Sequence, residues 1–83
     1  MKVKVKLYAT LMGCLPPGTK GQEVALDVSD DACIGEVLDR FSLPERMVHL
    51  VLVNGSFVAR EARPTWRLKE GDHLAVWPPV AGG

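Results

Sequence analysis

The chain has 83 residues, 47% hydrophobic and 24% charged, a composition typical of one small folded domain and not of a disordered segment. Ten basic residues balance ten acidic ones, so the net charge does not favour a general nucleic-acid-binding protein. No apolar run approaches the roughly 20 residues of a membrane helix, and the N-terminal residues alternate lysine with valine instead of forming the apolar block of a signal peptide. We therefore expect a cytoplasmic protein that binds neither nucleic acid nor membranes.

The first third of the chain predicts two strands joined by a long loop. In residues 2–10, apolar side chains alternate with lysines, which is the period of a strand buried on one face. The lysine row is either a solvated face or a surface that docks an acidic partner. Residues 13–21 contain three glycines and two prolines and predict a mobile or partner-facing loop. Alternation resumes in residues 22–28, which predicts an antiparallel hairpin.

One short helix is expected next. Ser29, Asp30 and Asp31 offer capping side chains and negative charge at the helix start. Pro44 ends the helix at or before residue 43, which leaves about three turns. Gly35 lies within the helix and costs about 1 kcal/mol relative to alanine, so the helix depends on packing against the sheet. Its apolar stripe consists of Ile34, Val37, Leu38 and Phe41.

The second hairpin has the clearest turn signal in the chain. Residues 48–53 form a nearly continuous apolar run, which predicts a strand buried on both faces. Asn54-Gly55 follows, and both residues tolerate the positive φ of a tight turn. The return strand begins at residues 57–58. His49 interrupts the apolar run and is interpreted as a strand-end or core residue in preference to a catalytic one.

The last strand is predicted at residues 74–77. A charged connection and a glycine-containing turn at residues 69–72 precede it, and Pro78 ends its hydrogen-bonding capacity. Trp77 lies where the strand becomes tail. It is either a cap on the core or an anchor in a partner's pocket.

The sequence predicts no metal site. Cys14 and Cys33 form no Cys-x-x-Cys pair, and His49 and His73 have no recognisable metal-ligand spacing. Packed, small apolar side chains are the favoured role for both cysteines over redox or metal chemistry.

These elements predict an α+β fold. The order is two strands, one helix and three strands, and the stripes are buried most compactly when the helix covers one face of a mixed sheet of four to five strands with the first and last strands adjacent. That arrangement is the β-grasp, or ubiquitin-like, fold. We expect it to span residues 1–77, and residues 78–83 to form an extended flexible C-terminal tail.

The tail has the composition of an arm that reaches into another protein. Pro78 and Pro79 favour extended geometry, while Gly82 and Gly83 have no Cβ and can pass through a narrow slot. Six extended residues reach roughly 20 Å at most, enough to place the Gly83 carboxylate inside a partner. The alternative is an inert, frayed chain end.

Three stretches resemble the MoaD/ThiS family of sulfur-carrier proteins. They are Val53-Asn54-Gly55, Leu68-Lys69-Glu70-Gly71-Asp72 and Val76-Trp77-Pro78-Pro79-Val80-Ala81-Gly82-Gly83. The resemblance covers the whole chain in element order and length. The ending looks most like that of the molybdopterin synthase small subunit, MoaD.

The resemblance implies a carrier without catalytic activity of its own and without a bound cofactor. A ubiquitin-activator-like adenylyltransferase of the MoeB/ThiF type would use ATP to adenylate Gly83, and a persulfide donor would convert it to a thiocarboxylate. The tail would then enter the large catalytic subunit of molybdopterin synthase (MoaE type), which builds the dithiolene of the molybdenum or tungsten cofactor. Gly82 and Gly83 are thus the reacting end, and the expected partner-binding residues are Trp77, Pro78, Pro79, Val80 and Ala81.

Three other functions fit the same residues. The first is a ThiS-like carrier for thiamine or another sulfur-transfer pathway. The second is a ubiquitin-like modifier that joins Gly83 to lysines of target proteins, and the third is an interaction module with an inert tail. Deletion of Gly83 is expected to leave only the last of these active.

Overall fold

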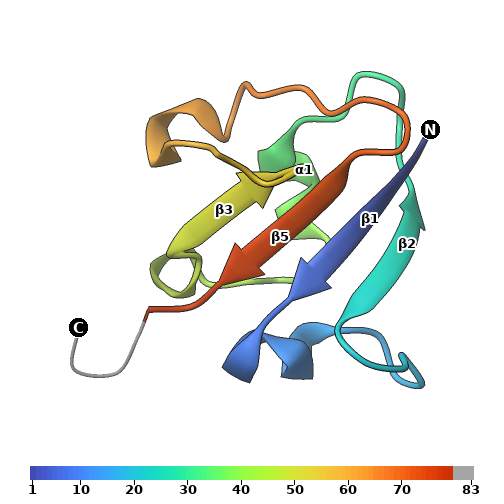
Figure 1. The fold of residues 1–83 in the computed structure, drawn as a ribbon, viewed down its shortest axis with the longest axis vertical. Coiled ribbons are helices and arrows are strands. Elements are labelled where there is room, and N and C mark those ends of the chain that lie inside the picture. The colour runs from blue at the N-terminus through green and yellow to red at the C-terminus, as the bar shows by residue number, and fades with distance from the viewer. Residues whose placement is uncertain (80–83) are drawn as a thin grey trace.

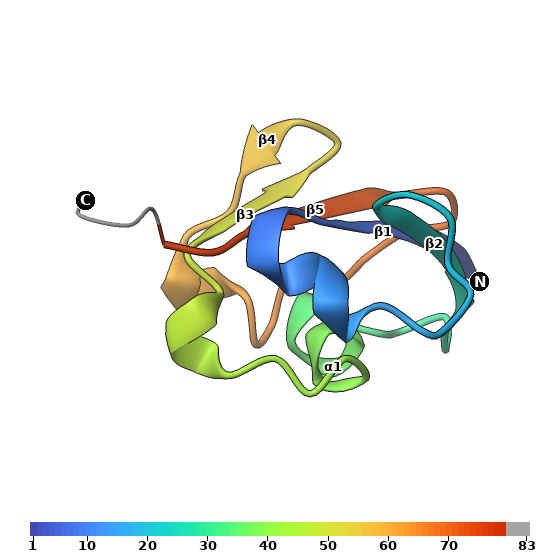
Figure 2. The ribbon, with the colours of Figure 1, turned by 90° about the horizontal axis from the view of Figure 1, so that it is seen from below.

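The computed structural model describes residues 1–79, so the predictions for Val80 to Gly83 lie outside the described residues. In the described part, five strands form one mixed sheet in the order β2-β1-β5-β3-β4; Figure 1 shows β2, β1, β5 and β3 side by side, and Figure 2 shows β4 next to β3. Parallel pairing of β1 with β5 places the first and last strands side by side, and all other neighbours are antiparallel. This topology confirms the predicted β-grasp. The strands are β1 (Lys2–Leu7), β2 (Glu23–Asp27), β3 (Leu50–Val53), β4 (Ser56–Phe57) and β5 (His73–Trp77).

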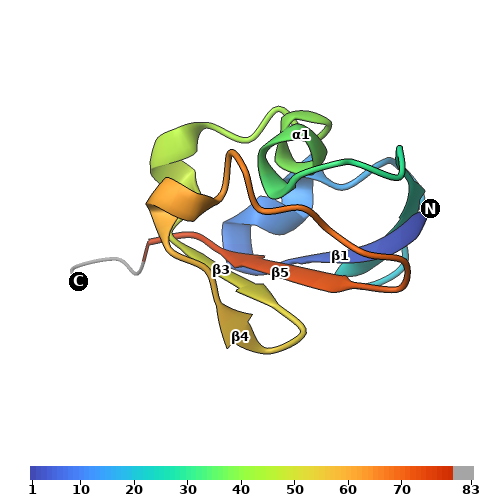
Figure 3. The same cartoon turned by 90° about the horizontal axis from the view of Figure 1, so that it is seen from above.

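The core lies on one face of this sheet, beneath helix α1 (Ile34–Asp39) (Figures 2 and 3). Alternation along each strand sends every second side chain to this inner face, as predicted for β1, where Val5 and Leu7 are 0% exposed. The helix contributes the stripe expected from its spacing. The inner side chains of the central strands and helix are Val3, Val5, Leu7, Ile34, Val37, Leu38, Val51, Val53, Leu74 and Val76.

Helix α1 is shorter than predicted, and the proposed cap is wrong. It has six residues, and its N-cap is Cys33, which makes no side-chain capping hydrogen bond. Two of its first N–H groups instead donate to distant carbonyls, Ile34 to Trp66 and Gly35 to Arg63. Because a crossing segment satisfies these donors, Ser29, Asp30 and Asp31 are not needed as caps.

The helix ends before Pro44 is reached. Ser42 has a φ of +53°, a left-handed conformation that an α-helix does not continue through. The chain then enters the 3-10 helix η2 (Glu45–Met47). The stripe residue Phe41 therefore packs in the core from a turn, beyond the helix end.

Strand β1 also ends earlier than residue 10. Tyr8 donates its N–H to the Val76 carbonyl at 3.1 Å, and Ala9, with a φ of +52°, turns the chain away from the sheet. A 3-10 helix, η1 (Ala9–Cys14), follows and buries Leu11 in the core. The sequence reading placed strand and loop residues here and missed this helix.

The prediction that the apolar run 48–53 is buried on both faces is wrong. The strand covers only Leu50–Val53, with Val51 and Val53 buried and Leu50 and Leu52 half-buried. The helices of the described residues lie on the inner side of the sheet (Figures 2 and 3). The outer face of β3 therefore remains accessible.

Candidate functional site

The root of the tail is the end of the central strand β5 (Figure 1). Backbone hydrogen bonds hold it from both sides, since His49 donates to the Trp77 carbonyl at 2.9 Å and Tyr8 donates to the Val76 carbonyl at 3.1 Å. Pro78 is buried and Pro79 is exposed. Neither proline has an N–H with which to continue the ladder, so the sheet pairing stops where the tail begins.

Trp77 stacks on Tyr8 at the root. The ring centroids are 4.2 Å apart and the planes are 5° from parallel. Both side chains are half-buried on the outer face, so the interpretation of Trp77 as a cap on the core is wrong. Such a pair contributes about 0.5–1.5 kcal/mol beyond its buried area, which fixes the last side chain before the tail.

An apolar surface extends from this stack across the outer face of the sheet. The register aligns Leu50 with Trp77, and Leu52 with both Ala75 and Phe57. Phe57 is the most open of these side chains, at 63% exposed, and the others are half-buried. We call this surface the open-face patch, and it consists of Tyr8, Leu50, Leu52, Phe57, Ala75 and Trp77.

Positive charge borders the patch on one side. Lys6 is aligned with Ala75, and Lys4 is aligned with His73, and all three polar side chains are exposed. The predicted lysine row therefore lies beside an apolar surface that leads to the tail. Apolar surfaces rimmed by polar groups are typical of protein-binding faces.

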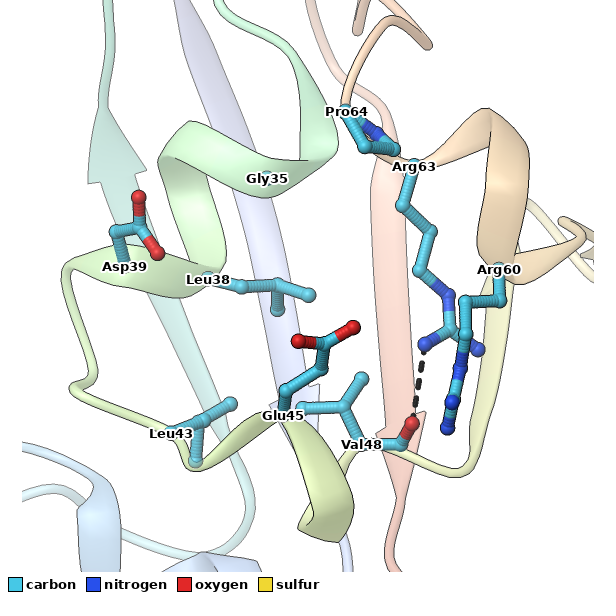
Figure 4. Close-up of a pocket in the computed structure, with 9 residues that line it drawn as sticks. All are labelled: Gly35, Leu38, Asp39, Leu43, Glu45, Val48, Arg60, Arg63 and Pro64. Atoms are coloured by element: carbon cyan, nitrogen blue, oxygen red, sulfur yellow. Dashed lines mark hydrogen bonds between the residues drawn. The ribbon is translucent and has the colours of Figure 1, made fainter.

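Arg63 is a buried charge that the sequence reading did not identify. It is 7% exposed, and its Nη1 donates to the Val48 carbonyl at 3.0 Å (Figure 4), while its Nη2 donates to the His49 carbonyl at 3.1 Å. Burial lowers the pKa of Arg63 below its ordinary value, and the neighbouring charge of Arg60 lowers this pKa further. In the sequence Arg63 lies in a charged connection, where arginine is normally solvated. Nothing in the sequence pattern indicated that it would be buried.

A cavity of about 260 Å³ lies beside Arg63, between α1 and the segment that contains η3 (Arg60–Ala62) (Figure 4). Both charge signs line it together with apolar side chains, which gives no preference for an anion or a cation. The nine residues that line it are Gly35, Leu38, Asp39, Leu43, Glu45, Val48, Arg60, Arg63 and Pro64.

The two internal motifs that carried the family resemblance meet at the other end of the sheet from the tail. The Asp72 carboxylate accepts hydrogen bonds from the Asn54 side-chain amide and from the Lys69 N–H, both at 2.8 Å. Asn54 in turn accepts a 2.9 Å bond from the His73 N–H through its side-chain oxygen, and its φ of +50° is the predicted turn geometry. These motifs hold the fold together and do not form a reactive centre.

The described residues thus contain the root of the predicted site and not its end. Trp77, Pro78 and Pro79 lie together where β5 ends, while Val80, Ala81, Gly82 and Gly83 lie outside the described residues. The division of the chain into a domain of residues 1–77 and a tail of residues 78–83 stays a prediction.

The other candidate residues do not converge on a centre. Within residues 1–79, no three His, Cys, Asp or Glu side chains are placed to hold a metal ion. Cys14 packs against the core, and the Cys33 thiol lies 3.4 Å from the Glu36 carboxylate. None of the helices in this part of the chain has the length and apolar character needed to cross a membrane.

Comparison with known proteins gives a consistent set of relatives. The family model described as the ThiS family matches residues 5–83. The crystal structure of SAMP1 from Haloferax volcanii is 30% identical, with a TM-score of 0.72 and 100% of both chains covered. The comparison with curated proteins gave no match.

Two further structures share the fold at lower identity. ThiS from Geobacter metallireducens is 20% identical, with a TM-score of 0.66 over 100% of both chains. A complex of subunits 1 and 2 of the molybdopterin-converting factor from Helicobacter pylori contains a chain that is 22% identical, with a TM-score of 0.60 over 100% of both chains.

Proposed function

Because the chain belongs to the ThiS family, whose model matches residues 5–83, we propose that it is a sulfur carrier whose reactive group is the Gly83 carboxylate. The family match confirms the resemblance inferred from the sequence. The observation that carries the proposal is that this match extends through Gly82 and Gly83, next to a strand whose pairing ends at Pro78.

The proposed chemistry requires activation by ATP. A carboxylate, with a pKa of about 3.5, exchanges oxygen for sulfur poorly because oxide is a poor leaving group. Attack of the Gly83 carboxylate on the α-phosphorus of ATP releases pyrophosphate and forms an acyl adenylate. A persulfide sulfur then displaces AMP, and a second thiol cleaves the sulfur–sulfur bond, which leaves the sulfur on Gly83 as a thiocarboxylate.

The catalytic groups for these steps belong to the partners. We propose an adenylyltransferase of the MoeB/ThiF type, a persulfide donor, and a cytoplasmic location for the reactions. Gly82 and Gly83 suit this role because a chain without Cβ atoms leaves the terminal carbonyl open to attack from either side.

We propose the molybdopterin pathway as the destination of the sulfur. The ending Pro78-Pro79-Val80-Ala81-Gly82-Gly83 supports it through its resemblance to MoaD. So does the shared fold with a chain of the Helicobacter pylori complex between subunits 1 and 2 of the molybdopterin-converting factor. The partner that receives the sulfur is then a large catalytic subunit of the MoaE type.

A ubiquitin-like modifier is the second candidate. SAMP1 from Haloferax volcanii, described as a small archaeal modifier protein, is 30% identical to this chain. Adenylation of Gly83 is common to both functions. They diverge at the acceptor, which is a sulfur for the carrier and a lysine amine for the modifier.

The open-face patch fits the protein that activates the tail. It is continuous with the tail root through Trp77, so an enzyme that holds the tail meets the patch as it approaches. We propose that the adenylyltransferase covers the patch and places acidic groups opposite Lys4 and Lys6, since complementary charge at the rim of an interface speeds association.

Pyrophosphate release tests the proposal. The full chain is incubated with ATP and an adenylyltransferase of the MoeB/ThiF type, in parallel with a variant that lacks Gly83. We expect pyrophosphate only with the full chain. Absence of pyrophosphate with an enzyme that activates its own carrier would contradict adenylation, and a ladder of lysine conjugates would favour the modifier.

A further inference from the structure

We propose that Arg63 is a positioning residue for the tail, acting through the backbone of residues 48–49. Its effect on activation rests on the proposed function, whereas its effect on the tail root does not.

The contacts form a short chain from Arg63 to the start of the tail. The guanidinium donates to the carbonyls of Val48 and His49 at 3.0 and 3.1 Å, and the N–H of the same His49 donates to the Trp77 carbonyl at 2.9 Å. The peptide bond of that carbonyl leads directly into Pro78. Arg63 therefore orients residues 48–49 through their carbonyls, and His49 in turn fixes the direction in which the tail leaves the sheet.

Arg63 is itself anchored from a different element. Its backbone carbonyl accepts a hydrogen bond from Gly35 at 3.2 Å, and a Cβ at Gly35 would lie 3.6 Å from the Pro64 Cα, so α1 packs closely on this segment (Figure 4). The side chain then spans from this segment to residues 48–49. It thereby joins the segment packed on α1 to residues 48–49, of which His49 is hydrogen-bonded to the end of β5.

The electrostatics favour a positioning role over simple stabilisation. Arg63 is 7% exposed and forms no ion pair with the carboxylates of residues 1–79, and its Nε has no hydrogen-bond partner among them. The carboxylates of Glu61 and Glu45 raise the pKa of Arg63 but do not offset burial and the charge of Arg60, and a buried charge without a close partner is costly compared with an apolar side chain of the same size. What the guanidinium adds is a two-pronged fork that orients two adjacent carbonyls.

We expect loss of the Arg63 contacts to reduce the fraction of molecules whose tail root has the direction that the activating enzyme binds. If the root adopts the direction that the activating enzyme binds for only a fraction of the time, the apparent affinity falls by that fraction. Once bound, the tail occupies the same position, and the chemical step is unchanged. Loss of the fork should therefore raise KM for the carrier and leave kcat unaltered.

The test compares Arg63→Met and Arg63→Lys with the control Arg60→Met. Arg60 is an exposed arginine of the same segment, and among the described residues it forms no hydrogen bond with residues 48–49. NMR measures amide exchange at His49 and at Leu7, whose N–H donates to Gln22 at the other side of β1. In Arg63→Met we expect about tenfold faster exchange at His49 with Leu7 unchanged, and about a tenfold higher KM in ATP-dependent adenylation at constant kcat. Arg63→Lys, which offers one nitrogen in place of the fork, should give smaller changes of the same kind, and Arg60→Met should match the wild type.

Wild-type His49 exchange and KM in a folded Arg63→Met variant would overturn the proposal, as would equal effects of Arg60→Met. If Arg63→Met does not fold, the same readouts on Arg63→Lys decide, and wild-type values for both would overturn it. If the wild-type chain is not adenylated at all, the proposed function fails, while His49 exchange still tests the contact of Arg63 with the tail root.

Discussion

An aspartate introduced on the inner face of the sheet should impair folding, whereas one introduced on the outer face should impair binding. Val5→Asp places a carboxyl group on the inner face, where Val5 is 0% exposed. Leu52→Asp places it on the outer face, where Leu52 is half-buried at the centre of the open-face patch. The pair separates a requirement for folding from a requirement for binding.

The magnitudes follow from burial. Val5→Asp removes a fully buried apolar side chain, at about 1.5–3 kcal/mol, and buries a polar group without a partner, at about 1–3 kcal/mol more. The sum, about 2.5–6 kcal/mol, is a large fraction of the whole stability of a domain of this size, about 4–12 kcal/mol. Leu52→Asp loses only part of a leucine's burial and leaves its carboxylate in water, so we expect about 1–1.5 kcal/mol.

Urea unfolding followed by circular dichroism measures the first effect, and adenylation kinetics measure the second. We expect Val5→Asp to lose about 2.5–6 kcal/mol of its free energy of unfolding, more than Leu52→Asp loses. Leu52→Asp should remain folded and raise KM for the activating enzyme by roughly 10- to 100-fold, the effect of losing about 1.4–2.8 kcal/mol at an interface centre. Equal unfolding of the two variants would refute the one-sided sheet, and a wild-type KM for folded Leu52→Asp would refute the docking role of the patch.

Three further predictions concern other parts of the molecule. Deletion of Gly83, or Gly82→Val, should change the free energy of unfolding by no more than about 0.5 kcal/mol and abolish pyrophosphate release, and a clear loss of thermal stability would mean that the tail belongs to the fold. Trp77→Ala should cost about 0.5–1.5 kcal/mol for the lost stack with Tyr8, beyond the lost buried area, and a melting temperature equal to wild type would contradict the role of this stack. Asp72→Ala should cost about 1–3 kcal/mol, because two hydrogen bonds to its carboxylate are lost, while kcat for adenylation stays unchanged below the melting temperature; a lower kcat would show that the far end of the sheet affects the tail.

The parts of the fold that were predictable from sequence are those set by local patterns. Alternation along residues 2–7 identifies the inner face of β1, and Asn54-Gly55 identifies the second hairpin, because each signal depends only on side-chain period or on permitted φ. The helix start was not predictable in the same way. Its donors are satisfied by the carbonyls of Trp66 and Arg63, residues far along the chain that no local capping rule includes.

Part of the candidate site was also predictable from local patterns, and part depends on tertiary contacts. The tail root follows from composition, since Pro78 and Pro79 end the ladder wherever the strand lies. The outer position of Trp77 depends on pairing between β5 and its neighbours, and an apolar run such as 48–53 does not reveal that only one layer covers the sheet. The burial of Arg63 depends on a tertiary contact with the carbonyls of Val48 and His49, which no local pattern around Arg63 reveals.

Intact mass spectrometry tests the carrier role most directly. The full chain and the Gly83 deletion variant are incubated with ATP, a MoeB/ThiF-type adenylyltransferase and a persulfide donor. A sulfur carrier gains the mass difference between one sulfur and one oxygen, located in its C-terminal peptide, and the deletion variant does not. An unchanged mass, with an enzyme that loads sulfur onto its own carrier under the same conditions, would contradict the proposed function.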